Sequence, residues 1–332
     1  MSEVHELQWF EAADLPGAVA ILSRLAQTGS PAKVMAGGTD LIGAMKDRLQ
    51  DHRQKAVVYI KDVPNLNRIA FEGGRLHIGA AATVSDIEES PLIRQRFPLL
   101  SMAAAHVASP QIRNMGTIGG NVNQRPRCWY YRSEDFNCYK KGGDFCFAVT
   151  GENQYHAVLG GELCYIVHPS DTAPALVALD ASARIVGPSG EKTVAFEQYF
   201  TSPRVDVLRE NILGPSDILA EIVIPEARSN ARGVYLKIRE RQVWDFATVA
   251  VAVQVAATNG VVDDARIVLG GVAPWPYRVP RAEEAIKGQR LTEDVARRAG
   301  DAAFVGARPM THNAYKVDMG KELVARALLA AV

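Results

Sequence analysis

Four cysteines are the residues of this chain best suited to chemistry, because a thiolate can bind a metal or act as a nucleophile. All of them lie within one short stretch: Cys128, Cys138, Cys146 and Cys164. Their spacing, Cys-x9-Cys-x7-Cys-x17-Cys, has neither the close pairs of structural zinc sites nor a ferredoxin run. Isolated core cysteines are the alternative, but residues 126–165 lack any clear helical or strand period. The pattern excludes a disulfide scaffold and favours metal ligation without naming the metal.

The same stretch is rich in positive charge. Its basic residues are Arg125, Arg127, Arg132, Lys140 and Lys141. Cationic side chains here would offset the negative charge of a thiolate-ligated cluster. The alternative is a solvated basic loop or a rim that faces a partner.

Two glycine-rich turns could approach an anion with their backbone N–H groups. The first is AGGTD at 36–40 and the second is GTIGGN at 116–121. Neither is the dinucleotide fingerprint or a Walker A loop, and each alone could be a plain turn. Together they suggest a pyrophosphate that is held from two sides, which fits a dinucleotide cofactor.

A carboxylate follows in HPSD at 168–171. Asp171 could accept hydrogen bonds from ribityl or ribose hydroxyls, but a Ser-Asp pair before an apolar helix is more typical of a helix cap. His106, His156 and His168 are expected to be surface or hydrogen-bonded core residues. Nothing in the pattern indicates a hydrolase centre.

The elements that must position these residues alternate at the start of the chain. Strands are expected at 7–10, 33–36 and 56–60, with helices opening at Asp14 and over 41–49, which predicts a small parallel or mixed sheet. A polar loop is expected at 109–114, and a domain boundary at 226–232. Beyond it we expect strands at 234–238, 247–256 and 265–270, then helices near 280–287, 293–306 and 313–331.

Composition sets the outer limits. At about 150 residues per domain, 332 residues suggest two domains. Lys and Arg number 37 and Asp and Glu number 37, so the zero net charge gives no field to attract nucleic acid or an anionic membrane. No apolar run approaches the ~20 residues of a membrane span. The acidic start of the chain predicts no signal peptide.

Six ordered segments, taken together, resemble the FAD-binding (medium) subunit of the molybdenum hydroxylases, the xanthine dehydrogenase and aldehyde oxidoreductase family. They are AGGTDLIGAMK at 36–46, SPQIRNMGTIGGN at 109–121, HPSDTAPALVAL at 168–179, DILAEIVIP at 217–225, YLKIRERQVWDFATVAVAV at 235–253 and GGVAPWPYRVPRAEEAI at 270–286. The resemblance implies an α+β fold with a two-lobed FAD-binding domain of the vanillyl-alcohol-oxidase/PCMH type. That domain would span 1–228, with lobes at about 1–60 and 61–228. A smaller α+β domain of the CO-dehydrogenase flavoprotein type would span 229–332.

The resemblance also assigns FAD-binding residues. Those at and around the first turn hold the pyrophosphate: Lys33, Val34, Met35, Ala36, Gly37, Gly38, Thr39 and Asp40, with Leu41 and Ile42 close by. Those of the second turn bind its other side: Gly116, Thr117, Gly119, Gly120 and Asn121. Asp171 contacts the flavin-proximal part, Val107 lines the adenine side, and Leu219 and Lys237 approach the flavin.

The chain departs from most of the family by an insertion at 122–168 that carries every cysteine. A minority branch with such an insertion binds a [4Fe-4S] cluster, and this insertion looks most like that of the aldehyde oxidoreductase type. The resemblance, rather than the spacing, therefore assigns Cys128, Cys138, Cys146 and Cys164 to one [4Fe-4S] cluster.

The resemblance implies an electron-transfer subunit without a catalytic side chain of its own. A large partner with a molybdenum cofactor would oxidise an aldehyde or N-heterocycle. Electrons would then pass two [2Fe-2S] clusters on a small partner and reach FAD here, then an external acceptor. A structural zinc loop without a cluster, or a stand-alone flavin oxidoreductase, are the alternatives. The expected location is the cytoplasm, or the periplasm by co-export with a partner that carries a twin-arginine signal.

Overall fold

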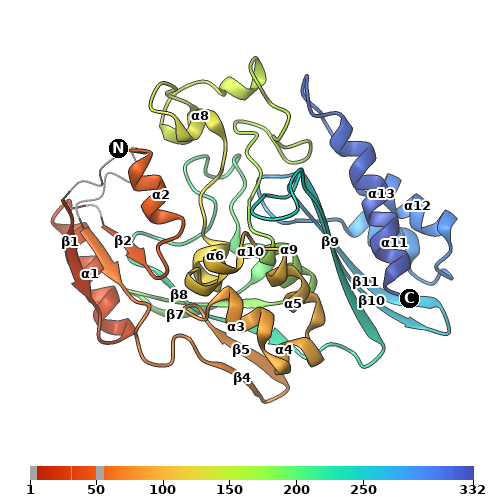
Figure 1. Ribbon diagram of the computed structural model, residues 1–332, viewed down its shortest axis with the longest axis horizontal. Helices are drawn as coiled ribbons and strands as arrows, with labels where there is room; N and C mark the ends of the chain where they lie inside the picture. The colour runs from red at the N-terminus through yellow and green to blue at the C-terminus, as the bar shows by residue number, and fades with distance from the viewer. Residues whose placement is uncertain (1–5, 31, 50–55) are drawn as a thin grey trace.

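The N-terminal region is a parallel three-stranded sheet with helices between its strands. The computed structural model describes residues 6–30, 32–49 and 56–332 (Figure 1). The sheet has the order β1-β3-β2, from β1 (Gln8–Glu11), β2 (Ala32–Met35) and β3 (Ala56–Tyr59). The three strands lie where the sequence predicted them, in a small parallel sheet. Helix α1 (Leu15–Gln27) begins where expected, because the Asp14 side chain accepts a hydrogen bond from the Gly17 N–H at 2.7 Å. Residues 1–5, on which the signal-peptide expectation partly rests, lie outside the described residues.

The middle of the chain forms an antiparallel five-stranded sheet. Its order is β4-β5-β8-β6-β7, from β4 (Ile69–Glu72), β5 (Arg75–Gly79), β6 (Ser182–Gly187), β7 (Gly190–Ala195) and β8 (Ile218–Pro225). The helices of this region are α3 (Val84–Glu89), α4 (Pro91–Arg96), α5 (Pro98–Ala105), α9 (Thr172–Ala178) and α10 (Phe196–Tyr199). Because β5 pairs with β8, the sheet brings together segments from before and after the long insertion.

The C-terminal region is an antiparallel sheet covered by three helices. The strands are β9 (Ala231–Ile238), β10 (Val249–Thr258), β11 (Val261–Gly270) and β12 (Tyr277–Arg278), and the helices are α11 (Pro280–Ile286), α12 (Glu293–Ala303) and α13 (Tyr315–Ala330) (Figure 1). Strand β10 alternates between two cores. Its valines, such as Val251 and Val253, join the core with α11–α13, whereas Ala250 and Ala252 join the core of the preceding region. This period-2 pattern fixes the C-terminal sheet between its own helices and α5 and α9.

Two local predictions are wrong, that of a loop at 109–114 and that of a plain turn at 116–121. The expected polar loop at 109–114 and the second glycine turn form two short helices, α6 (Pro110–Met115) and α7 (Ile118–Val122). Pro110 supplies the fixed φ of a first helical turn, and the Thr117 hydroxyl caps α7 by accepting from the Gly120 N–H at 3.1 Å.

Strand β9 begins at Ala231, inside the expected boundary at 226–232. The proposed division at residue 228 stays a prediction.

The insertion at 122–168 is mostly irregular, as predicted. It contains one helical turn, α8 (Trp129–Arg132), and two 3-10 turns at Tyr139–Lys141 and Phe147–Val149. Figure 1 shows this yellow-green segment between α2 (Leu41–Lys46) and α13. Within the described residues, no helix is long and apolar enough to cross a membrane.

Candidate functional site

The two glycine turns lie directly against each other. A Cβ atom on Gly37 would lie 1.9 Å from the backbone oxygen of Met115, and one on Gly116 would lie 3.3 Å from Thr39 Oγ1. Gly38 has a φ of 70°, in the left-handed region that favours glycine. The glycines therefore permit the close approach of the two turns, and so form a cradle made largely of backbone.

A cavity of about 890 Å³, the glycine-turn cavity, opens beside these turns. Its volume lies within the range of about 300–1,000 Å³ that is typical of ligand sites. Many of the predicted FAD residues line it: Lys33, Val34, Met35, Ala36, Gly37, Gly38, Thr39, Asp40, Leu41, Thr117, Gly119, Gly120 and Leu219. The pairing of two turns around one ligand space is what the sequence predicted.

Two further cavities continue from this one. The middle cavity shares Thr39 and Asp40 with it and adds Val107, Asn121 and Asp171. Gly116 lines the middle cavity as well. The insertion cavity, of about 430 Å³, shares Asp171 and Arg127 with the middle cavity and reaches Cys128. The three cavities thus share walls and form an elongated path, which suits an extended dinucleotide.

Four of the predicted residues are placed differently from the rest. Ile42 and Lys237 line none of these three cavities, and Ile42 is 41% exposed. Leu219, expected near the flavin, lies in the glycine-turn cavity, whereas Val107, expected near the adenine, lies in the middle cavity with Asp171. Leu219 and Asp171 therefore occupy opposite parts of the path.

Asp171 is buried and does not cap α9, because its side chain makes no cap hydrogen bond. The cap interpretation is therefore wrong for Asp171, although the Ser170 hydroxyl of the same pair accepts from the Ala173 N–H at 3.1 Å. Instead its carboxylate accepts from the Tyr235 hydroxyl at 2.7 Å and from Lys237 Nζ at 2.8 Å. Lys237 also donates to the backbone oxygens of His106 and Asp245. Strand β9 therefore holds the predicted flavin-proximal carboxylate in place, and Lys237 acts on the cavity through Asp171.

Asn121 joins the two ends of the insertion. Its Oδ1 accepts from the hydroxyls of Ser170 and Thr172, both at 2.6 Å. The insertion consequently leaves and rejoins the fold at nearly the same point, so that the glycine turn and Asp171 remain neighbours in spite of it.

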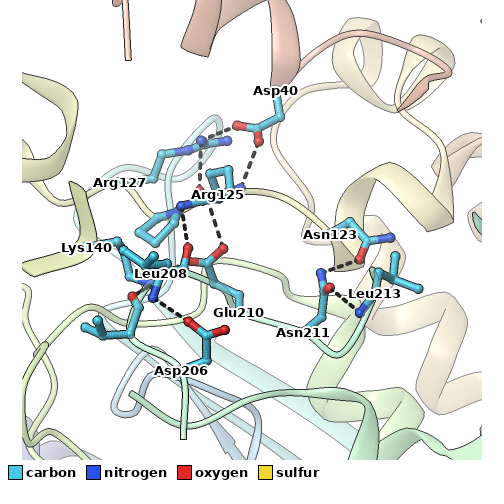
Figure 2. Close-up of polar contacts among 12 residues, drawn as sticks. Asp40, Asn123, Arg125, Arg127, Lys140, Asp206, Leu208, Glu210, Asn211 and Leu213 are labelled. Atoms are coloured by element: carbon cyan, nitrogen blue, oxygen red, sulfur yellow. Dashed lines mark hydrogen bonds and ion pairs between the residues drawn. The ribbon is translucent and has the colours of Figure 1, made fainter. Parts of the chain in front are cut away.

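Four of the five basic residues of the insertion pair with carboxylates, namely Arg125, Arg127, Arg132 and Lys140 (Figure 2). Lys141 instead donates to the backbone oxygen of Ser133 at 2.5 Å. Asp40 forms ion pairs with Arg127 and Arg132 and accepts from the Arg125 N–H at 2.8 Å. Glu210 pairs with Lys140 at 2.5 Å and with Arg125 at 3.0 Å. The alternative of a rim that faces a partner stays a prediction, whereas that of a solvated basic loop is wrong for these four residues. They tie the insertion to the first glycine turn and to the segment around Glu210.

This pairing predicts an acid-labile contact. Burial alone would raise the pKa of Asp40, but Arg127, the Arg125 N–H and Arg132 outweigh it and hold this pKa below 3.8. A depressed folded pKa stabilises the fold fully above the unfolded value of about 3.9 and loses this effect as pH falls through the folded pKa. Asp40→Asn is expected to cost about 1.5–3 kcal/mol at pH 6.

Urea unfolding of wild type and Asp40→Asn at several pH values tests this prediction. The difference in the free energy of unfolding should be constant above about pH 5 and shrink below about pH 4. A difference that stays constant to pH 3 contradicts the assigned role of Asp40.

All four cysteines line one small space, the cysteine cavity. Backbone N–H groups face their sulfurs: those of Tyr130 and Tyr131 at Cys128, those of Ala148, Val149 and Tyr165 at Cys146, and that of Ile166 at Cys164. Burial raises the pKa of Cys128 to about 11 and that of Cys164 to about 12, so these thiols are protonated at neutral pH in the metal-free chain. Metal binding would displace those protons.

The four cysteines lie around one common space. Among the described residues, no group of three or more His, Cys, Asp or Glu side chains is arranged to hold a metal ion.

His156 is the residue that the sequence pattern missed. Its Nε2 lies 3.2 Å from the Cys128 sulfur, and its ring lines the cysteine cavity and the insertion cavity. Burial and the nearby Lys316 ammonium lower the pKa of His156 to about 4. Its place in the chain between Cys146 and Cys164 was the available signal.

Two known families match most of this chain. The family of the FAD binding domain in molybdopterin dehydrogenase matches residues 5–227, and that of the CO dehydrogenase flavoprotein C-terminal domain matches residues 234–331. The chain therefore belongs to the FAD-binding subunits of the molybdenum hydroxylase family, as its sequence motifs suggested. The match supports FAD as a cofactor of this chain.

Individual relatives agree with this assignment. The FAD-binding subunit of aldehyde oxidoreductase from Escherichia coli (strain K12) is 30% identical over 92% of this chain and 93% of its own length. The carbon monoxide dehydrogenase medium chain from Hydrogenophaga pseudoflava is 30% identical over 95% and 93%, respectively. A solved structure of that dehydrogenase matches with a TM-score of 0.77 at 28% identity, over 99% of this chain and 98% of the other. The predicted α+β fold, with an FAD-binding domain and a C-terminal domain, is confirmed.

Proposed function

We propose that this chain is the FAD and [4Fe-4S] electron-transfer subunit of a molybdenum-containing complex of the aldehyde oxidoreductase and xanthine dehydrogenase type. A large subunit with the molybdenum cofactor would oxidise the substrate, and a small subunit with two [2Fe-2S] clusters would deliver the electrons. The observation that carries the proposal is the path of adjoining cavities from the glycine turns to the four cysteines. The names of the relatives, a subunit of aldehyde oxidoreductase and a chain of CO dehydrogenase, support the assembly.

FAD would lie along the glycine-turn and middle cavities. When bound, it supplies the chemistry of accepting and releasing electrons. The first glycine turn, around Gly37, would hold the pyrophosphate. Gly120 of the second turn lines the same space, with its N–H donating to the Thr117 hydroxyl. Asp171 would accept hydrogen bonds near the flavin. Leu219 and Val107 would contact the opposite ends of FAD from those that the sequence suggested. Leu219 would lie toward the adenine and Val107 toward the flavin.

Four cysteines around one space match the number of thiolate ligands of a [4Fe-4S] cluster. They are Cys128, Cys138, Cys146 and Cys164. Four thiolates would also suit a structural zinc ion, so the metal analysis below decides between the two. Backbone N–H groups aimed at sulfur also stabilise the negative charge of a ligated cluster. The buried Lys140 lies near enough to favour the thiolate of Cys164.

The work of this chain's side chains is therefore to bind and orient rather than to transfer protons. The substrate, aldehyde or N-heterocycle, would be recognised on the large subunit. The complex would lie in the cytoplasm, or it would reach the periplasm by co-export with a partner that carries a twin-arginine signal.

Metal analysis of the complex, purified without oxygen, tests the cluster. Cys146→Ser is expected to lower the iron content by about four atoms per chain, with an equal loss of acid-labile sulfide, while FAD remains. The matched control is Ser133→Ala on the surface of the insertion. Zinc in place of iron and sulfide contradicts the cluster and supports a zinc loop. Activity of the chain alone, without molybdenum, supports a stand-alone flavin oxidoreductase.

A further inference from the structure

His156 forms part of the wall between the cysteine cavity and the insertion cavity. It shares this position with Cys128 and Ile166, which also line both cavities. Asp171 lines the far side of the insertion cavity. The edge made by Cys128 and His156 is therefore the part of the cysteine site that faces the predicted flavin end of the path.

The surroundings of the imidazole indicate which nitrogen carries the proton. Nε2 lies 3.2 Å from Cys128 Sγ, whereas the buried Nδ1 has no hydrogen-bond partner. A proton on Nδ1 would leave a buried donor unpaired and would point the Nε2 lone pair at an electron-rich sulfur. When Cys128 is a cluster-bound thiolate, which can only accept, the tautomer with Nε2–H avoids both costs and Nε2–H donates to the sulfur.

Lys316 on α13 fixes the segment that carries this ring. Its side chain is fully buried, and Nζ donates to the backbone oxygens of Tyr155 at 2.8 Å, His156 at 3.2 Å and Gly271 at 2.8 Å. No carboxylate of the described residues forms an ion pair with it. Burial lowers the pKa of Lys316 to about 7, and a negatively charged cluster nearby would raise this pKa again by favouring the ammonium form.

We propose that His156 tunes the reduction potential of the cluster by donating a hydrogen bond to the Cys128 sulfur, and that Lys316 is the positioning residue that holds His156 there. This inference rests on the proposed [4Fe-4S] cluster. Reduction adds one negative charge to the cluster, so an N–H donor and a buried cation both favour the reduced state. Both residues should therefore raise the potential.

A redox titration of the complete complex, followed by the electron paramagnetic resonance of the cluster, tests this role. His156→Phe keeps a ring but removes the donor, and is expected to make cluster reduction about tenfold less favourable, a shift of about 59 mV to more negative potential. His156→Gln keeps an N–H donor and should recover most of this shift. Lys316→Met should shift the potential in the same direction as His156→Phe. His77→Phe, on β5 in the middle sheet, is the matched control and should leave the potential unchanged.

The outcomes separate this inference from the proposed function. An intact cluster in His156→Phe with the wild-type potential overturns the tuning role and leaves the cluster assignment standing. Loss of iron in both His156→Phe and His156→Gln, with both variants folded and FAD-loaded, makes His156 a ligand and also overturns it. Wild-type protein without iron overturns the proposed cluster, and the inference with it.

Discussion

Lys237→Met is expected to destabilise the protein by about 3–5 kcal/mol, because it leaves the buried Asp171 carboxylate without its cation. The Lys237 side chain is fully buried and that of Asp171 is 6% exposed. The substitution also removes the donors to the backbone oxygens of His106 and Asp245. Since Asp171 lines the middle cavity, FAD retention should fall together with stability. Urea unfolding and the FAD content of the purified protein measure the two effects.

Two comparisons isolate the buried charge. Asp171→Leu combined with Lys237→Met should be more stable than Lys237→Met alone, because neither charge is then left unpaired. Lys192→Met removes the same side chain from a partly exposed pair with Asp217 and should cost at most about 1 kcal/mol. Equal costs for Lys192→Met and Lys237→Met would refute the importance that we assign to burial.

Gly37→Ala is expected to lower FAD affinity at least about tenfold, which corresponds to about 1.4 kcal/mol. The added Cβ would lie 1.9 Å from the Met115 backbone oxygen, so the two glycine turns must separate. A backbone atom cannot move aside by changing rotamer, and overpacking of this kind typically costs about 1–3 kcal/mol of stability as well. Titration of the cofactor-free protein with FAD, followed by flavin fluorescence, measures the affinity.

Gly43→Ala is the matched control. Gly43 lies six residues further on in α2, where an added Cβ meets no atom within 4 Å. It should stabilise the helix by roughly 0.5–1 kcal/mol and leave FAD affinity unchanged. An FAD affinity in Gly37→Ala equal to that in Gly43→Ala would mean that the contact between the turns does not shape the site.

Much of the architecture could be predicted from local pattern. Asp14 and Pro16 mark the start of α1, and Asn259-Gly260 marks the turn between β10 and β11, where both residues have positive φ. Glycine was misleading at 116–121, because a Thr117 cap and burial of Ile118 stabilise a short helix there. Helix propensity disfavours glycine and takes no account of tertiary contacts such as the burial of Ile118, so it does not predict this helix.

The candidate site could be predicted only in part. The glycine turns, Asp171 and the cysteines are recognisable because their types are chemically distinctive. The partners of Asp171, on the other hand, are 64 and 66 residues away on β9, and their register there is set by pairing with β10. The basic residues of the insertion resembled a solvated loop, because the sequence does not reveal that Asp40 and Glu210 face them.

The sequence by itself determined the family, most strands of the N-terminal and C-terminal regions and the gathering of every cysteine in one insertion, since these follow from local residue types and their order. Only the tertiary structure decided the order of the strands in the sheets, the shared walls of the cavities, the contact of Lys237 with Asp171, and the position of His156 beside Cys128. The physical reason is that burial, charge pairing and hydrogen-bond direction depend on residues that are distant along the chain. The fold brings those residues together, and no local pattern encodes their separation.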